Sequence, residues 1–462
     1  MSSSPHFGAT PGTVSPGSTA TAPVALPSLH QFFAPGGILS SRFPQYEFRR
    51  GQLDMAQAVE RALTERRHLI VEAGTGTGKT LAYLLPALRS GRRVIISTGT
   101  KNLQEQLFYK DIPLLEEALF GATGVLKVCY MKGRGNYLCR QKLFTLSEVP
   151  VLSEFDEVEQ YNRIREWERT TITGDRAELS FLPENSLLWN KLDARSDNCT
   201  GQKCPQFEQC FITEMRRKAL ESDLIIVNHH LFFADLSIKL SAIARSEDGE
   251  IPPHIGLLPE AGSVIFDEAH ELEKVATDYF GIGISNLRID ELCRDVQNGL
   301  HAQKCMTDGV MQALGNARTH SDLFFAALPK SNGRAAFRNR ADFLEEFGDR
   351  YQSLYASLVR IKEEIQLIKN RPDEAFAFMR RAHELAESLH YCLEENDPGK
   401  VFWIEHRQRR GRTPRTDVFL QATPIDVSEI LQQVLFSRYE SVVLASATLA
   451  VSDSLGYVRD RL

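Results

Sequence analysis

The sequence lacks the features that mark membrane, secreted and strongly basic proteins. None of its apolar runs approaches the roughly 20 residues that span a bilayer, and residues 1–28 have no basic and apolar regions of a secretory signal. Eight cysteines in 462 residues are too few for a disulfide scaffold. The formal net charge is -6, so any nucleic-acid-binding surface would have to be local. We expect a cytoplasmic protein without membrane contact, whose thiols are reduced or bound to metal.

The composition indicates a globular protein of several domains. Hydrophobic residues make up 42% of the chain and charged residues 25%, and this length corresponds to about two to four domains. Residues 1–28 are rich in Ser, Thr, Pro, Gly and Ala, and they cannot bury enough apolar surface to offset their ordering entropy. This composition predicts a disordered tail over 1–28.

The first motif that carries chemistry is HLIVEAGTGTGKTLAYLLPAL at 68–88. An apolar run, a glycine-rich turn and a helical pattern that starts at Thr80 and ends or kinks near Pro86 are typical of a phosphate-binding loop. Glycines let backbone N–H groups approach phosphate oxygens, Lys79 adds a charge for the β and γ phosphates, and Thr80 adds a hydroxyl for Mg²⁺. The first position of the usual pattern is Ala73 instead of glycine. The residues expected to hold the nucleotide are Ala73, Gly74, Thr75, Gly76, Thr77, Gly78, Lys79 and Thr80.

Two adjacent acids follow a second apolar run, in GSVIFDEAHEL at 262–272. Asp267 is expected at the carboxyl end of a strand, where ligands gather in open α/β sheets. There Asp267 can hold Mg²⁺ through water, and Glu268 can orient and deprotonate the attacking water. Two acids at this position could also mark only a helix N-terminus. A phosphate-binding loop in the same chain favours catalysis, with Glu268, Asp267 and Lys79 as catalytic side chains.

These motifs occur, with others, in the order found in superfamily 2 helicases. Residues 267–270 form a DEAH box, and YEFRRGQ at 46–52 resembles the Q motif, in which Gln52 would read adenine. Further matches are STGTKNLQEQL at 97–107 to motif Ia, IIVNHHLFF at 225–233 to a segment typical of the DinG and XPD group, and VVLASATL at 442–449 to motif III. Over residues 29–462 the chain resembles the bacterial DinG-type iron–sulfur helicases, relatives of XPD.

The resemblance implies a fold and an activity. The fold would be an α/β RecA-like P-loop NTPase core, interrupted by an inserted iron–sulfur domain and an inserted helical arch domain. The activity would be that of an ATP-dependent DNA helicase that moves 5′ to 3′ on single-stranded DNA and unwinds duplexes in DNA repair or replication. Motif Ia would touch the DNA backbone, and Ser446 and Thr448 would couple nucleotide state to a second motor domain. ATP and Mg²⁺ would be cofactors, single-stranded DNA and DNA junctions the partners, and the protein a monomer.

Three cysteines lie close together in CTGQKCPQFEQC at 199–210. With a remote fourth ligand they suit either a structural zinc ion or an iron–sulfur cluster. No pair has the two-residue gap usual for zinc, which slightly favours the cluster. Cys129 follows a strand-like run, so Cys139, in the family-like stretch GRGNYLC, is the preferred fourth ligand. The resemblance implies a [4Fe–4S] cluster on Cys139, Cys199, Cys204 and Cys210.

The two insertions have different patterns. The segment at 131–218 is charged and rich in loops, so we expect metal binding to supply folding energy that its own core cannot, with a wedge or redox sensor as the alternative role. The stretch from 343 to 392 carries two apolar stripes at helical spacing, separated by Arg371-Pro372. These stripes predict an antiparallel helical hairpin, for which an independent dimerising coiled coil is the alternative.

The expected domain organisation follows from these motifs. The domains are a tail at 1–28, helicase domain 1 in three parts at 29–130, 219–275 and 401–462, the iron–sulfur insertion at 131–218 and the arch at 276–400. No pattern of a second RecA-like half follows motif III, so we expect a fragment, or a chain with a separate second half, with weak ATP hydrolysis and no unwinding. The alternative functions are a metal-stapled DNA-binding module with a vestigial ATP site and another P-loop ATPase or kinase.

Overall fold

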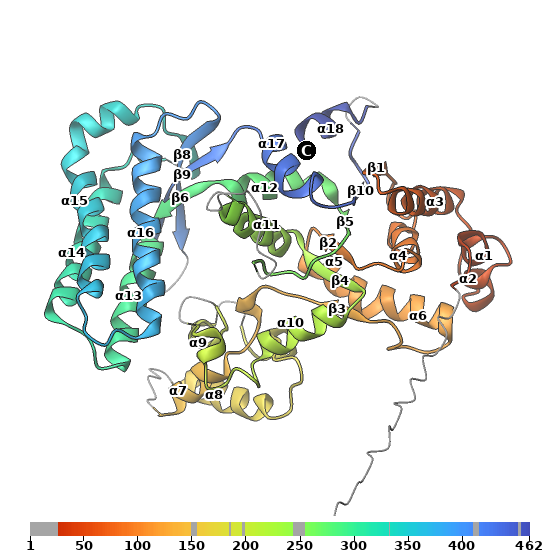
Figure 1. Ribbon diagram of the computed structural model, residues 1–462, viewed down its shortest axis with the longest axis horizontal. Helices are drawn as coiled ribbons and strands as arrows, with labels where there is room; N and C mark the ends of the chain where they lie inside the picture. Colours follow the sequence, from red (N-terminus) through yellow and green to blue (C-terminus); the bar gives the residue numbers. More distant parts are fainter. Residues whose placement is uncertain are drawn as a thin grey trace, which may run out of the picture.

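The computed structural model is built around a six-stranded parallel sheet (Figure 1). It describes residues 26–148, 155–183, 186–195, 199–243, 255–331, 333–409, 415–450 and 454–462. The strands, in sheet order, are β1 (Leu69–Glu72), β10 (Ser441–Ser446), β5 (Ser263–Asp267), β2 (Val94–Thr98), β4 (Leu224–Asn228) and β3 (Val128–Tyr130). The mixed α/β core with a parallel sheet is therefore confirmed.

Helices cover both faces of this sheet, which is why its strands read as continuous apolar runs. Ile96 and Ile226 lie in the core on one face, and Ile95 and Ile225 lie in the core on the other. The first face packs against α1 (Leu29–Phe33), α2 (Ile38–Arg42), α3 (Arg50–Glu65), α4 (Lys79–Arg89) and α6 (Ile112–Phe120). The second face packs against α10 (Phe211–Glu221), α11 (His229–Ile243), α12 (Leu272–Phe280), α17 (Ser428–Leu431) and α18 (Gly456–Arg461).

Helix α4 continues past the proline at which we expected it to end or kink. It extends to Arg89, three residues beyond Pro86. Pro86 removes one backbone hydrogen bond, but Leu85 and Ala87 on either side of it are fully buried. Their packing against the sheet holds the last turn in the helix.

The segment that carries the four candidate cysteines forms a small unit below the sheet in Figure 1. Its helices are α7 (Arg140–Glu148), α8 (Phe155–Glu168), α9 (Leu187–Leu192) and α10. Tyr161, Ile164, Trp189 and Leu192 are buried together in a core of its own. The segment therefore has a core that its sequence did not indicate, because apolar residues at irregular spacing, without a visible period, converge from several short helices. We call residues 131–218 the cysteine unit.

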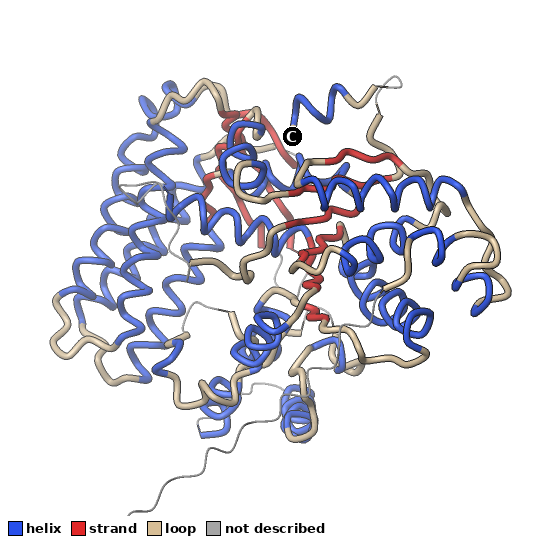
Figure 2. Tube along the Cα trace, turned by 45° about the vertical axis from the view of Figure 1, so that its right-hand side comes forward, coloured by secondary structure: helices blue, strands red, loops and turns tan. Residues whose placement is uncertain are grey.

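A second unit is inserted between β5 and β10. Its helices are α13 (Asn286–Ala302), α14 (Asp308–Ala327), α15 (Arg340–Gln366) and α16 (Asp373–Glu394), and Figure 2 shows them side by side. Helices α15 and α16 form the predicted hairpin, with Leu354, Leu358, Phe378 and Leu389 fully buried in the unit's core.

This helical unit also contains a sheet that the sequence did not reveal. It is antiparallel, with the order β6 (Ile282–Ser285), β9 (Arg415–Pro424), β8 (Lys400–Arg409) and β7 (Gly333–Ala336). Residues 400–409 and 415–424 therefore pair within the inserted unit and not with the central sheet, so the expected boundary at 400 does not match the strand pairing. The helical pattern ended near 400 because strands, not solvent-exposed loops, follow it.

The N-terminal segment is attached to the core at its end. The tail predicted over 1–28 falls mostly outside the described residues, although Ser28 caps α1 and the carbonyls of Leu26 and Pro27 accept hydrogen bonds from Arg89. In the part of the chain that the structure describes, no helix combines the length and apolar composition needed to cross a membrane.

Candidate nucleotide site and cysteine cluster

The loop between β1 and α4 has the backbone that phosphate binding needs. Gly76 and Gly78 have φ angles of 83° and 82°, in the left-handed region that favours glycine. A Cβ atom on Gly78 would also lie 2.3 Å from Nε2 of Gln52. Gly78 immediately precedes α4 and offers no side chain to cap it, so the free N–H groups of the first turn face the loop.

Two side chains of the preceding segment hold this loop in place. Gln52 is buried in α3, and its Nε2 donates to the carbonyl oxygen of Gly78 at 3.0 Å. The hydroxyl of Tyr46 donates to Oε1 of Gln52 at 2.9 Å. The guanidinium of Arg49 donates to the carbonyl of Gly76. The predicted Q-motif residue thus lies beside the loop, and Arg49 is a further anchor that sequence reasoning did not single out.

The basic and acidic side chains predicted to catalyse converge at the carboxyl edge of the sheet. Nζ of Lys79 lies 3.3 Å from Oε1 of Glu268. Asp267 is almost fully buried, and its Oδ2 accepts a hydrogen bond of 3.1 Å from the hydroxyl of Tyr83. Burial and the neighbouring Glu268 carboxylate raise the pKa of Asp267, while Lys79 and Tyr83 act against them. A cation next to Asp267 would therefore relieve an unfavourable buried charge.

Thr80 and the remaining loop residues lie around this centre. Thr80 stands in the first turn of α4 and hydrogen bonds to Tyr83. Tyr83 was not predicted, although its position one helical turn after Lys79 places it on the same helix face. In the rest of the loop, the Ala73 N–H donates to the Ser446 carbonyl at 3.0 Å, and Oγ1 of Thr77 donates to the Gly74 carbonyl at 2.5 Å. Thr75 is exposed.

Strand β10 brings Ser446 against residues 267–271, at and just after the carboxyl end of β5, which we call the acidic turn. Oγ of Ser446 lies 2.8 Å from Nδ1 of His270 and 3.4 Å from Oε2 of Glu268. The backbone N–H of Thr448 donates to Oγ of Ser446 at 3.4 Å, and the Thr448 side chain is exposed. Ser446 therefore touches the acidic turn directly, whereas Thr448 is joined to it through its backbone.

Glu72 links the phosphate-binding strand to the segment after β10. Its Oε2 accepts hydrogen bonds from the N–H groups of Leu449, at 2.6 Å, and Ala450, at 2.5 Å. These bonds favour the charged form and lower the pKa of Glu72. No local signal in the sequence marks Glu72, because its partners stand 377 and 378 residues away.

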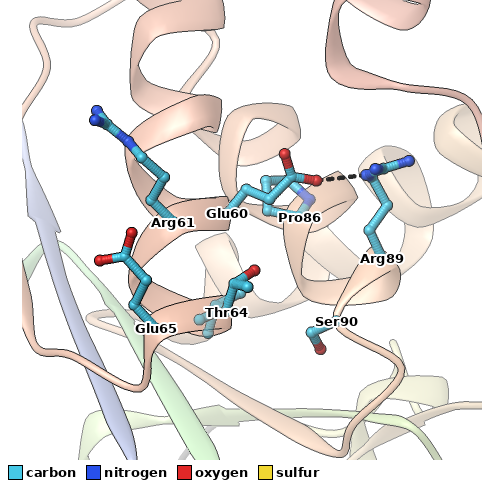
Figure 3. Close-up of a pocket in the computed structure, with 8 residues that line it drawn as sticks. Glu60, Arg61, Thr64, Glu65, Pro86, Arg89 and Ser90 are labelled. Carbon is cyan, nitrogen blue, oxygen red and sulfur yellow. Dashed lines mark hydrogen bonds and ion pairs between the residues drawn. The ribbon is translucent and has the colours of Figure 1, made fainter.

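A separate polar pocket lies at the far ends of α3 and α4, away from the nucleotide loop (Figure 3). Its volume is about 320 Å³, and Arg89 donates to Glu60 across it at 2.5 Å. Its lining residues are Glu60, Arg61, Leu63, Thr64, Glu65, Pro86, Arg89 and Ser90. Since it mixes both charges and faces none of the catalytic side chains, it adds nothing to this site.

Two of the candidate cysteines lie at helix N-termini, which favour the thiolate that metals bind. Cys139 immediately precedes α7, and Cys210 is the residue before α10. Burial raises the pKa of Cys139, the Lys142 amide opposes this, and the nearby Cys210 adds to the rise. By contrast, Cys129 is buried in β3 with its thiol 3.7 Å from the Met215 carbonyl, outside the cysteine unit.

Two arginines approach the same thiols. Burial acts to raise the pKa of Cys199, but the Gly201 amide and the guanidiniums of Arg134 and Arg216 outweigh it, so this pKa lies below its usual value. Arg216 interacts electrostatically with Cys210 as well. Positive charge near several thiols fits an anionic thiolate-bound metal group.

The four thiols nevertheless do not form a closed ligand set. All eight cysteines are free, and among the described residues no three His, Cys, Asp or Glu side chains lie close enough together to hold a metal ion. The chemistry of the donors fits a metal group, whereas their described positions do not by themselves define one.

Comparison with known proteins finds similarity to two groups of helicases. Residues 54–133 match the model of the DEAD/DEAH box helicases. The chain is 33% identical to the ATP-dependent DNA helicase YoaA of Haemophilus influenzae over 437 residues, which cover 93% of this chain and 64% of that protein. It is 30% identical to the ATP-dependent helicase DinG of Mycobacterium tuberculosis, over 88% of this chain and 60% of that protein. The chain is a homologue of the YoaA and DinG helicases.

These matches cover most of this chain but only part of each relative. The chain spans just under two thirds of the length of the YoaA and DinG helicases that it matches. Among solved structures, the helicase XPD aligns with a TM-score of 0.42 and 14% sequence identity, over 88% of this chain and 59% of that chain.

Proposed function

We propose that this protein is an ATP-dependent DNA helicase that hydrolyses ATP to move 5′ to 3′ along single-stranded DNA. The observation that carries the proposal is the convergence of Lys79, Asp267 and Glu268 beside a glycine loop at the carboxyl edge of the sheet. In this arrangement Lys79 would bind the β and γ phosphates, Thr80 and Asp267 would hold Mg²⁺, and Glu268 would orient the attacking water.

The ion pair between Lys79 and Glu268 suggests how nucleotide prepares the site. Phosphate oxygens would compete with Glu268 for the Lys79 ammonium. Binding would therefore release the Glu268 carboxylate, which remains within reach of Ser446 and His270. Released in this way, Glu268 can accept a proton from water.

The proposed contact with DNA is the loop after β2 together with α5 (Lys101–Gln106). Thr100 caps α5 by accepting from the N–H of Leu103 at 3.3 Å, so the first turn of α5 is fixed at the sheet edge. Lys101 reaches from this turn to Asn136 of the cysteine unit at 3.2 Å. A helix start with a lysine favours phosphate, and the helical unit would help to enclose the strand.

The proposed function is tested by ATP hydrolysis with and without single-stranded DNA. We expect slow hydrolysis that rises with oligothymidine and disappears in Glu268→Gln. A rate of ATP hydrolysis that does not change with DNA but rises with a small phosphate acceptor would favour a P-loop kinase instead. DNA binding that is identical in wild type, Lys79→Ala and Glu268→Gln under all nucleotide conditions would favour a DNA-binding module with a vestigial ATP site.

We also propose that Cys139, Cys199, Cys204 and Cys210 hold a [4Fe–4S] cluster. The support comes from the two helix N-termini and from the positive charge of Arg134 and Arg216 near the thiols. When bound, such a group would fix the short helices of the cysteine unit against one another.

Metal analysis of protein purified without oxygen tests the cluster. We expect about four iron and four sulfide per chain, lost in Cys199→Ser and retained in Cys305→Ser, a half-buried cysteine of the helical unit. One zinc and no sulfide would contradict the cluster and leave the nucleotide site unaffected.

The remaining features of the proposal concern organisation. We propose a monomer that acts on single-stranded DNA and DNA junctions in the cytoplasm, where free thiols persist. We keep the proposed domains at 29–130, 131–218 and 219–275, and we extend the helical insertion to 424 because β8 and β9 pair within it.

A further inference from the structure

Two buried side chains join the carboxyl end of β2 to the helix after β4. Oγ of Ser97, in β2, lies 2.7 Å from Nδ1 of His229, the first residue of α11. Both residues are fully buried. Neither side chain can therefore touch a nucleic acid or a nucleotide, and any effect they have on such ligands must be transmitted through their neighbours.

The His229 ring continues this connection toward the acidic turn. The ring lies against Phe266, with centroids 5.8 Å apart, and the backbone of Asp267 and Glu268 lies beside it. Its second nitrogen, Nε2, has no hydrogen-bond partner among the described residues. The ring therefore lies on one face of the sheet, where it contacts side chains of both β2 and its paired neighbour β5.

A second contact is made by the loop itself. A Cβ atom on Gly99 would lie 2.6 Å from Oε2 of Glu271 and 3.5 Å from Cβ of Glu268. The backbone at Gly99 thus approaches the acidic turn so closely that a side chain here would displace the end of Glu271. The loop expected to contact DNA therefore lies beside Glu271 and Glu268, of which Glu268 is the residue expected to activate water.

The backbone of Glu268 shows why these contacts matter. Its φ angle is 58°, in the left-handed region that residues with a side chain rarely adopt. Such a conformation persists only where the surrounding structure imposes it. Ser97, His229 and Gly99 are part of those surroundings, so a displacement of the loop would change the constraint on Glu268.

We propose that Ser97, His229 and Gly99 are positioning residues through which a DNA strand bound at the loop after β2, over residues 99–101, sets the position of Glu268. This inference rests on the proposed function and adds to it a route that couples DNA binding to the position of Glu268. A DNA strand that displaces this loop moves Gly99 and, at the end of β2, Ser97. Ser97 then acts on the acidic turn through His229, and Gly99 acts on it by direct contact. Nucleotide bound at Glu268 changes the loop by the same route, because thermodynamic coupling is reciprocal.

The test is the coupling between two ligands, not activity. The dissociation constant of a fluorescein-labelled oligothymidine is measured with and without a saturating, non-hydrolysable ATP analogue and Mg²⁺, and the ratio is the coupling factor. We expect a factor of about five or more in the wild type. Ser97→Ala should bring it to within about twofold of one, while the affinity for each ligand alone is unchanged.

Matched variants separate coupling from folding. His229→Asn keeps a polar group that can bond to Ser97 and should retain most of the factor, whereas His229→Leu should lose it. Gly99→Ala meets only the flexible end of Glu271 and one ordinary contact, so it should fold and show a reduced factor. Gly315→Ala, on the exposed face of α14 with open space around it, should match the wild type.

The possible outcomes show separately whether the coupling route fails and whether the proposed helicase function fails. A wild-type factor near one, or an unchanged factor in Ser97→Ala, Gly99→Ala and His229→Leu, would overturn the coupling route but leave the proposed function standing. A wild-type chain that binds neither oligothymidine nor the analogue would overturn both.

Discussion

Replacing His229 by asparagine should change how the stability of the protein depends on pH. Burial lowers the pKa of His229 from its ordinary 6.5 to about 4, with nearby His230 and His270 adding to the effect and the backbone of Glu268 and Asp267 opposing it. The folded protein therefore resists protonation at this site. In the unfolded chain the same imidazole takes up a proton at its ordinary pKa.

The magnitude follows from these two values. A base with a lowered pKa contributes stability that is fully present above 6.5 and is lost as the pH falls from 6.5 toward 4. At pH 5 an unfolded histidine is almost wholly protonated, whereas buried His229 is mostly neutral. Proton linkage then gives a loss of about 2 kcal/mol between pH 7.5 and pH 5, approaching about 3 kcal/mol at lower pH. His229→Asn removes this loss.

Urea unfolding at pH 7.5 and pH 5 measures the effect. The wild-type protein should lose about 2 kcal/mol more of its free energy of unfolding than His229→Asn over this range, because all other groups titrate alike in both proteins. The difference between the two pH dependences isolates His229 even if the variant is less stable at both pH values. Equal losses in the two proteins would refute a neutral, buried imidazole at this position.

Three further predictions concern other parts of the molecule. Lys79→Met should weaken binding of MgATP by about 10- to 100-fold, because a charge-assisted contact contributes about 1.5–3 kcal/mol; calorimetric titration checks this, and the exposed Lys330→Met is the control. Tyr83→Phe removes the hydroxyl that donates to buried Asp267 and should lower the free energy of unfolding by about 1–2 kcal/mol in urea; an unchanged midpoint would contradict this bond's importance. Leu354→Ala, in the core of the helical unit, should lower that free energy by about 2–5 kcal/mol while MgATP affinity measured in native buffer stays unchanged.

The central sheet and its nucleotide loop could be predicted because their signals are local. A buried parallel strand is a short apolar run, and the turn after β1 must contain glycine where φ is positive, as at Gly76 and Gly78. Because the carboxyl ends of parallel strands share one edge of a sheet, the sequence alone places Asp267 near Lys79. These features follow from a few neighbouring residues each.

The features that sequence reasoning missed depend on contacts between distant residues. Glu72 acquires its role only when β10 brings the amides of Leu449 and Ala450 beside it. The core of the cysteine unit combines Tyr161, Trp189 and other side chains that share no period along the chain. Strands β8 and β9 follow a long helical pattern, and only their pairing with β6 and β7 assigns them to the helical unit.

Because β10 lies between β1 and β5 and is the last strand to be synthesised, the sheet can be completed only after residues 441–446 have been made. Both neighbours are synthesised long before residues 441–446, and the whole helical unit is made in between. Until β10 arrives, β1 and β5 each present an unpaired edge, which is a surface that favours association with other chains. Such non-local pairing is slow to form. The yield of native protein should therefore be limited by the insertion of this one strand, and chains that end before residue 441 should aggregate even though the other five strands are present.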